Sequence, residues 1–232
     1  MTPSPVAEEP EVPESEGPAE VREPATGGIR RPLLGLIRPV AAHQLRALAS
    51  LGLWLVRRRD GVGAGGVGFG YSRDQTAMML LMLSSIVIEG VAVLYLVSWP
   101  VLHTIMLVLH VYAVTLTLGL IAAALTRPHV IGGGHLRLRY GAGFDLRVPL
   151  ELVAGVRIER RIHDGGLIRL GGDLLEIVVG AQTNVTVELS EPIMVTRLLG
   201  RPGMASLIRI KADEPEEFVR ELGRQIKDAR QP

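Results

Sequence analysis

Cysteine is absent from the 232 residues, so the chain can form neither a disulfide framework nor a thiolate metal site. Lysine is nearly absent as well, because only Lys211 and Lys227 occur. Aromatic residues make up 4% of the chain and do not alternate with the basic residues, as they do in sites that stack nucleic-acid bases. The sequence therefore predicts no nucleic-acid partner, and we attribute the excess of arginine to codon usage.

Signatures of catalysis are also missing. The serines lack a G-x-S-x-G context, and the histidines His129, His135 and His163 show neither H-x-H nor H-E-x-x-H spacing. We interpret His129 and His135 as surface residues at the membrane-proximal edge of a domain. We expect a protein that is not an enzyme and has no catalytic residue, no metal and no cofactor.

Residues 61–70 read GVGAGGVGFG and contain a formal G-x-G-x-x-G match at Gly61, Gly63 and Gly66. A dinucleotide-binding loop follows a strand and opens a helix. Here a basic segment precedes the glycines and an apolar segment follows them. We therefore interpret residues 61–76 as a flexible glycine-rich linker.

Charge is distributed unevenly beneath an overall net charge of +1. Residues 1–28 contain seven glutamates against one arginine, a local net of −6, and are rich in proline. Such a segment cannot bury enough apolar surface to offset its ordering entropy, so we expect a disordered acidic tail, with docking to a partner as the alternative. Residues 29–60 contain seven arginines against one aspartate, a local net of +6.

Apolar residues recur at three- and four-residue steps over Leu33–Arg59, which predicts a basic amphipathic helix within residues 29–60. Pro39 is expected to break or kink its start. A helix of this kind lies in the membrane interface with its arginines near anionic head groups. The alternative is a helix that packs on the protein's own surface. The candidate lipid or partner contacts are Arg38, Arg46, Arg57, Arg58 and Arg59.

Two long apolar runs follow, at residues 77–99 and 101–125. Each is longer than the roughly 20 residues with which a helix crosses a bilayer core of ~30 Å, and Pro100 separates them. They predict a two-helix transmembrane hairpin, residues 77–125. Its turn has no lysine or arginine, whereas basic residues flank both outer ends. The positive-inside rule then predicts a multi-pass protein of the cell membrane with both termini in the cytoplasm.

One acidic residue, Glu89, falls inside the first apolar run. A charge at mid-bilayer costs roughly 2.5–3.5 kcal/mol on insertion scales, so it needs a partner. Glu89 and His110 are about equally far from the turn, and His103 shares a face of the second helix with His110. We expect an intramembrane polar group of these three residues. It would lock the two helices, pair across an oligomer, or serve in proton movement or in haem or metal ligation.

After Pro128 the apolar period changes to two residues. Alternating runs separated by turn residues predict about seven short strands, and thus a small sandwich or barrel. Asp213 and Glu216 form an N-terminal capping pattern for a final helix. The basic residues of one strand face are expected to be solvated, or to touch anionic lipid or an acidic partner: Arg157, Arg160, Arg161 and Arg169.

Seven strands followed by one helix is the order of pleckstrin-homology-like domains. The stretches Leu136–Gly141 and Asp145–Val156 resemble the opening strands of the bacterial version, which is often attached to short membrane hairpins. The stretch from Gly68 to Asp213 resembles an uncharacterised membrane-protein family of high-GC bacteria. The resemblance implies an α+β membrane protein in which a transmembrane α-helical hairpin precedes a pleckstrin-homology-like β-barrel or sandwich with a C-terminal helix, residues 128–230. Phosphoinositide binding is not implied, because the basic residues are scattered.

The sequence thus predicts a non-enzymatic, membrane-anchored interaction or assembly module that presents a cytoplasmic domain to a protein partner or to the membrane surface. The expected partners are the lipid bilayer and either another protein or a second copy of the chain. An exposed strand edge would recruit a peptide by strand addition. The alternative is a small transport-related membrane subunit that uses Glu89 and His110 in proton or solute movement. A third candidate function is that of an intramembrane redox carrier.

Overall fold

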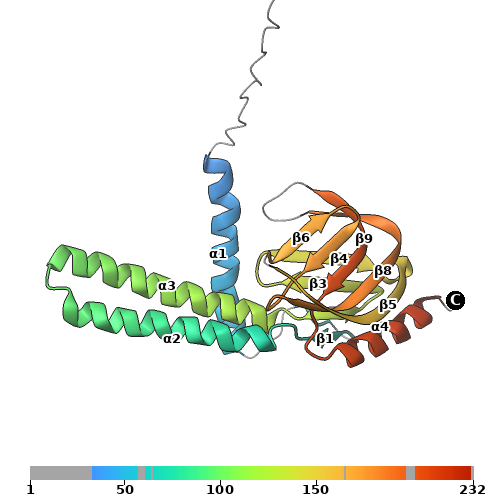
Figure 1. Ribbon diagram of the computed structural model, residues 1–232, viewed down its shortest axis with the longest axis horizontal. Helices are drawn as coiled ribbons and strands as arrows, with labels where there is room; N and C mark the ends of the chain where they lie inside the picture. Colours follow the sequence, from blue (N-terminus) through green and yellow to red (C-terminus); the bar gives the residue numbers. More distant parts are fainter. Residues whose placement is uncertain (1–32, 57–60, 64, 165, 197–201, 231–232) are drawn as a thin grey trace, which may run out of the picture.

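The computed structural model describes residues 33–56, 61–63, 65–164, 166–196 and 202–230. Within them the chain is an α+β protein with three helices, two β-sheets and a C-terminal helix (Figure 1). The acidic tail expected at residues 1–28 lies outside the described residues. So do Arg57, Arg58 and Arg59, together with the side chain of Arg38.

Two long helices, α2 (Arg73–Leu96) and α3 (Pro100–Thr126), form an antiparallel pair that extends away from the β-sheets (Figure 1). Both are long and apolar enough to cross a membrane. α2 begins one turn earlier than the expected span at residues 77–99. Pro100 is the first residue of α3 and not a spacer between helices, because proline at the first helical position leaves no intrahelical hydrogen bond unmade.

The basic helix α1 (Leu33–Leu55) runs through Pro39 as one helix, so the expected break is absent. It crosses α3 close to the β-sheets (Figure 1). Small residues make this crossing close: Ala47 and Ala123 are fully buried, and a Cβ on Gly119 would lie 3.1 Å from the carbonyl group of Ala47. α1 therefore packs on the protein's own helices. It also leaves apolar side chains exposed, at Leu45, Leu48, Trp54 and Leu55.

The first sheet is antiparallel and has the order β1-β2-β3-β4. Its strands are β1 (Val67–Phe69), β2 (His129–Gly132), β3 (His135–Tyr140) and β4 (Phe144–Pro149). β1 precedes the helical pair in the sequence and β2 follows it, with Val67 opposite Ile131. The expectation of a flexible linker over residues 61–76 is therefore wrong for its second half, which contains β1 and the first turn of α2.

The second sheet has the order β5-β8-β9-β7-β6, and only its β7–β9 pair is parallel. A short 3-10 helix (Leu150–Leu152) leads into it. Its strands are β5 (Val153–Ile162), β6 (Ile168–Gly171), β7 (Leu174–Ile177), β8 (Gln182–Val195) and β9 (Gly203–Ile210). β8 continues through Pro192, a residue type that usually ends a strand, because the register shift between Glu188 and Ile193 interrupts the ladder where proline has no N–H to donate.

Both sheets are open and share one hydrophobic core with the C-terminal helix α4 (Pro215–Arg230). Phe218, Leu222 and Ile226 line the buried face of α4, at the spacing of one helical stripe. The two sheets do not join into one closed barrel. The described residues contain nine strands where about seven were expected. The strands β1, β2 and β6 were not expected, because three or four residues each are too few for an alternating pattern to be visible, whereas the apolar runs on both sides of Pro192 form the single strand β8.

Candidate functional site

The β-sheets are joined to the base of the helical pair by a junction of buried and polar contacts. Tyr71, just before α2, is buried, and its hydroxyl oxygen accepts the N–H of Gly141 at 2.7 Å. Asp213, just before α4, donates its N–H to the carbonyl of Gly70 at 2.8 Å, and its carboxylate accepts the N–H of Arg73 at 3.2 Å. The Asp213 bonds connect segments about 140 residues apart and the Tyr71 bond connects segments 70 residues apart, so the junction fixes the domain on the helices.

A buried lysine strengthens the same junction. The Nζ atom of Lys211, at the end of β9, lies 2.9 Å from the Oδ2 atom of Asp74 in the first turn of α2. Only 11% of the lysine side chain is exposed, so the aspartate offsets part of the cost of burying its ammonium group. A Cβ on Gly70 would come 2.5 Å from Oδ2 of Asp213, which explains why glycine occupies that position.

His129 lies at the centre of the junction, and its interpretation as a surface residue is wrong. Its ring is fully buried and lies against Tyr71, with 4.8 Å between the ring centroids. Its Nδ1 accepts the N–H of Arg139 at 3.1 Å, so Nε2 carries the proton and donates to the carbonyl of Lys211 at 3.2 Å. Burial lowers the pKa of His129 to about 4, and the Arg139 charge adds to this while the bond to Lys211 opposes it. His135, in contrast, is exposed as expected.

The helical pair brings Glu89 and His110 together. Oε2 of Glu89 lies 3.9 Å from Nε2 of His110. Nδ1 of His110 lies 2.8 Å from the carbonyl of Met106, which can only accept, so Nδ1 carries a proton and Nε2 faces the glutamate. A Cβ on Gly90 would lie 3.2 Å from the His110 ring. The glycine beside Glu89 therefore gives the ring room, which the sequence interpretation had missed.

His103 does not join this pair. Its Nδ1 lies 3.2 Å from the carbonyl of Val97, so it bonds to the turn between the helices. The side chain of His110 is 15% exposed and that of Glu89 is 71% exposed, so the carboxylate sits on the outer surface of the pair. The geometry therefore leaves one side of Glu89 open to lipid or to another chain.

We predict that Glu89→Ala lowers the thermal stability of the protein in mild detergent, by roughly 0.5–2 kcal/mol, because polar contacts between membrane helices have this size. The same change should reduce the yield of any oligomer that the parent forms. Ser84→Ala is the matched control, since Ser84 is exposed on α2 and, among the described residues, bonds to the carbonyl of Leu80 alone. A Glu89→Ala protein as stable and as assembled as the parent would refute the locking role.

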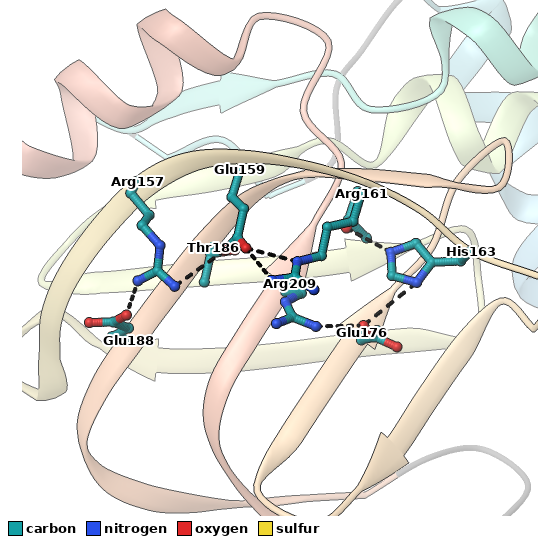
Figure 2. Close-up of polar contacts among 9 residues, drawn as sticks. Arg157, Glu159, Arg161, His163, Glu176, Thr186, Glu188 and Arg209 are labelled. Atoms are coloured by element: carbon teal, nitrogen blue, oxygen red, sulfur yellow. Dashed lines mark hydrogen bonds and ion pairs between the residues drawn. The ribbon is translucent and has the colours of Figure 1, made fainter.

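A ladder of charged side chains crosses one face of the second sheet (Figure 2). Glu159 accepts hydrogen bonds from Arg161 at 2.8 Å and from Thr186 at 3.0 Å, and these bonds lower its pKa to about 2. Arg157 bonds to Glu188 and to Glu159. Of the arginines expected to be solvated or to touch lipid, Arg157, Arg161 and Arg169 are thus paired with carboxylates of the same or a neighbouring strand. Arg160 is exposed and has no partner among the described residues.

The inner end of this ladder has a carboxylate–imidazole–hydroxyl order. His163 lies 3.6 Å from Glu176 through Nδ1 and 2.8 Å from the Thr183 hydroxyl through Nε2, and Arg209 binds the same carboxylate at 3.0 Å (Figure 2). Thr183 is only 1% exposed, so no substrate reaches its hydroxyl. The arrangement is therefore that of a buried polar network, which rigidifies the sheet.

Of the expected lipid contacts, only Arg46 has a described side chain, and it turns toward the protein. Its Nη1 donates to the carbonyl of Ala142 at 3.2 Å, and its Nε donates to the carbonyl of Ala42 at 3.1 Å. Arg46 thus helps to hold α1 against the turn between β3 and β4. Sequence reasoning could not foresee this contact, because the two partners are 96 residues apart.

Among the residues that the structure describes, no three His, Asp or Glu side chains are grouped so that they could hold a metal ion. Comparisons with known proteins add nothing to this description: no protein family, no curated protein and no solved structure matches the chain.

Proposed function

We propose that this protein is a membrane-anchored, non-enzymatic interaction or assembly module. In this proposal α2 and α3 span the cell membrane, both termini are cytoplasmic, and the β domain is presented at the inner surface to a protein partner or to the membrane. The observation that carries the proposal is the junction around His129, Lys211 and Asp213. A domain that is fixed on two apolar helices by buried contacts is held in one orientation, as a presenting module requires.

The surface of the helical pair supports the membrane part of the proposal. No residue of α2 is buried, and many of its exposed side chains are large and apolar. Tyr95 and Trp99 are exposed at the turn, where aromatic side chains suit a membrane–water boundary. α1 crosses the base of the pair with exposed leucines, which suits a helix in the membrane interface.

The pleckstrin-homology-like assignment remains part of the proposal. In its favour are two sheets and a C-terminal helix around one core. Nine strands and the parallel β7–β9 pair depart from the expected order of seven strands and a helix. Because β1 comes from before the helical pair, the domain would be a variant whose first sheet is completed by the anchor itself.

Exposed apolar side chains on the β domain suit a protein partner. Ile162 is 85% exposed and Met194 is 70% exposed, on two different strands of the second sheet. Within the described residues β6 pairs with β7 alone, so its other edge is open to strand addition.

Site-specific photo-crosslinking in native membranes tests this function. A crosslinking side chain at Ile162 or at Met194 of the full chain should capture one defined protein, or a second copy of the chain. Tyr95 is the matched control, because it is equally exposed but lies next to the turn of the helical pair. Capture from Tyr95 alone, or capture of lipid alone from all three positions, would contradict the proposal.

A second candidate function, a transport-related subunit, is favoured by the protonation geometry of the Glu89–His110 pair. Nδ1 of His110 donates to the carbonyl of Met106, so Nε2 is the ring atom that faces the Glu89 carboxylate, at 3.9 Å. Glu89→Gln keeps the shape of the side chain and removes its titratable carboxyl group. Proton flux into proteoliposomes that is lost in Glu89→Gln would establish transport, whereas a module would retain its crosslinking partner in the same variant.

A further inference from the structure

One side of α2 carries a line of side chains that stays exposed in the described part of the chain. The line consists of Met78, Met82, Ser85, Glu89 and Leu96, whose spacing of three, four or seven residues places them on the same side of a helix. α3 packs against both α1 and α2, whereas no residue of α2 is buried. We call this line the Glu89 side of α2, and it is open to a partner.

The carboxylate of Glu89 lacks a hydrogen-bond donor within the described residues. Its Oε2 lies 3.9 Å from Nε2 of His110, which is longer than a hydrogen bond, and 71% of the side chain is exposed. In the hydrocarbon region of a bilayer a carboxylate without a partner is costly, and lipid tails offer no hydrogen bond. A donor from outside the chain would therefore stabilise Glu89.

Ser85 is a donor without an acceptor on the same side of α2. It is exposed one turn before Glu89, and its hydroxyl makes no hydrogen bond with a described residue. The neighbouring Ser84, in contrast, donates to the carbonyl of Leu80 at 2.9 Å. Side chains of a helix lean toward its N-terminus, so that of Glu89 leans toward residue 85. The Glu89 side thus carries an unused acceptor and an unused donor about 6 Å apart along the axis.

A second copy of the chain complements this arrangement. Copies in one membrane have the same orientation, so a pair of them is related by a twofold axis along the membrane normal, and their α2 helices run parallel. Parallel helices bring residues of similar depth together. The Glu89 of each copy then meets the Ser85 of the other, and the small serine lets the helices approach closely. Another protein would have to bring a matching donor, whereas α2 supplies its own.

We propose that the Glu89 side of α2 binds the same side of α2 in a second copy of the chain, with each Glu89 carboxylate accepting the Ser85 hydroxyl of the other copy. The contact between Glu89 and His110 persists in this dimer, because the His110 side chain is only 15% exposed and lies toward α2 within its own chain. The inference rests on the membrane-spanning helices of the function proposed above, and it names the partner in the membrane.

The absence of cysteine makes disulfide trapping a direct test of this contact. Met82→Cys places one thiol on the Glu89 side and leaves Ser85 and Glu89 unchanged. Leu80→Cys is the matched control, because Leu80 is 49% exposed and Met82 is 55% exposed, and two residues lie about 160° apart around a helix. Mild oxidation of native membranes that contain two differently tagged forms of the full chain should trap Met82→Cys as a dimer of both forms. Leu80→Cys should stay monomeric.

The polar contact itself is tested in the Met82→Cys chain. Ser85→Ala should lower the trapped dimer about fivefold, the effect of losing two equivalent polar contacts between membrane helices. Ser84→Ala should leave it unchanged, since the Ser84 hydroxyl bonds within its own helix. Equal trapping of Met82→Cys and Leu80→Cys, equal effects of the two serine changes, or a trapped product that contains another protein would each overturn the proposal.

Alkaline carbonate extraction of the same membranes separates this inference from the proposed function. If the chain stays in the membrane pellet and Met82→Cys is not trapped, the helices span the membrane and the dimer is wrong. If carbonate releases the chain, the membrane-spanning role and the dimer are both wrong.

Discussion

Acidification from about pH 7.5 to about pH 4.5 is expected to lower the free energy of unfolding by about 2–3 kcal/mol, mainly through His129. The folded protein holds this histidine neutral, with a pKa of about 4 against an ordinary value of 6.5, because the ring is fully buried. Between these two values the unfolded chain binds a proton and the folded protein does not. The contribution of the neutral His129 to the free energy of unfolding is therefore fully present above about pH 6.5, and it declines as the pH falls toward 4.

Thermal unfolding in detergent at a series of pH values measures this decline. His129→Gln offers the matched variant, because glutamine can accept and donate hydrogen bonds but does not titrate. Its stability at neutral pH should be lower, and its loss between pH 6.5 and pH 4.5 should be much smaller. Glu159, whose folded pKa is about 2, changes stability only as the pH falls from about 4.5 toward 2, so the two effects separate. If the thermal stability of the parent protein did not change between pH 7.5 and pH 4.5, that result would contradict the burial of His129.

Phe218→Ala is expected to destabilise the protein by about 3–5 kcal/mol, the usual cost of removing a buried phenylalanine. The ring of Phe218 is fully buried and packs edge-on against Phe69 at 5.2 Å between centroids, and it lies 6.4 Å from the ring of His129. It therefore connects α4 with β1 and β2, on both sides of the helical pair in the sequence. Denaturant unfolding followed by circular dichroism measures the loss.

Val219→Ala on the same helix is the control for this change. Val219 is only partly buried against the core, so its truncation should cost about 1 kcal/mol or less. If Phe218→Ala were as mild as Val219→Ala, α4 would not belong to the shared core, and the domain would have to be described as two separate layers.

Several features could be predicted from the sequence because their signals are local. The two apolar runs define α2 and α3, and the capping pattern before residue 215 identifies α4. The proximity of Glu89 and His110 also follows from local rules, because an antiparallel pair with a short turn brings together residues at equal distances from that turn. The role of the pair stays a prediction.

Other features depend on pairings between distant segments and could not be foreseen. β1 and β2 are too short to show a pattern, so His129 looked like a surface residue, although Arg139 and Lys211 enclose it in the folded chain. Glu188 lies on β8, and only the register of β5 with β8 places it beside Arg157, whereas the position of Glu159 between Arg157 and Arg161 follows from the alternation within β5. The glycines of residues 61–66 looked like a linker because their contact is with β2, more than 60 residues away.

The pairing of β1 with β2 also determines the order in which the chain can fold during synthesis. Val67 and Ile131 are partners, and both helices lie between them. The ribosome must synthesise α2 and α3 before β1 can pair with β2. Phe69 of β1 can be buried in the core only after that pairing. A complete β domain therefore requires that both helices have been synthesised. In a chain whose helices failed to pair, β1 would stay apart from β2, and the edge of the first sheet would be open to proteolysis.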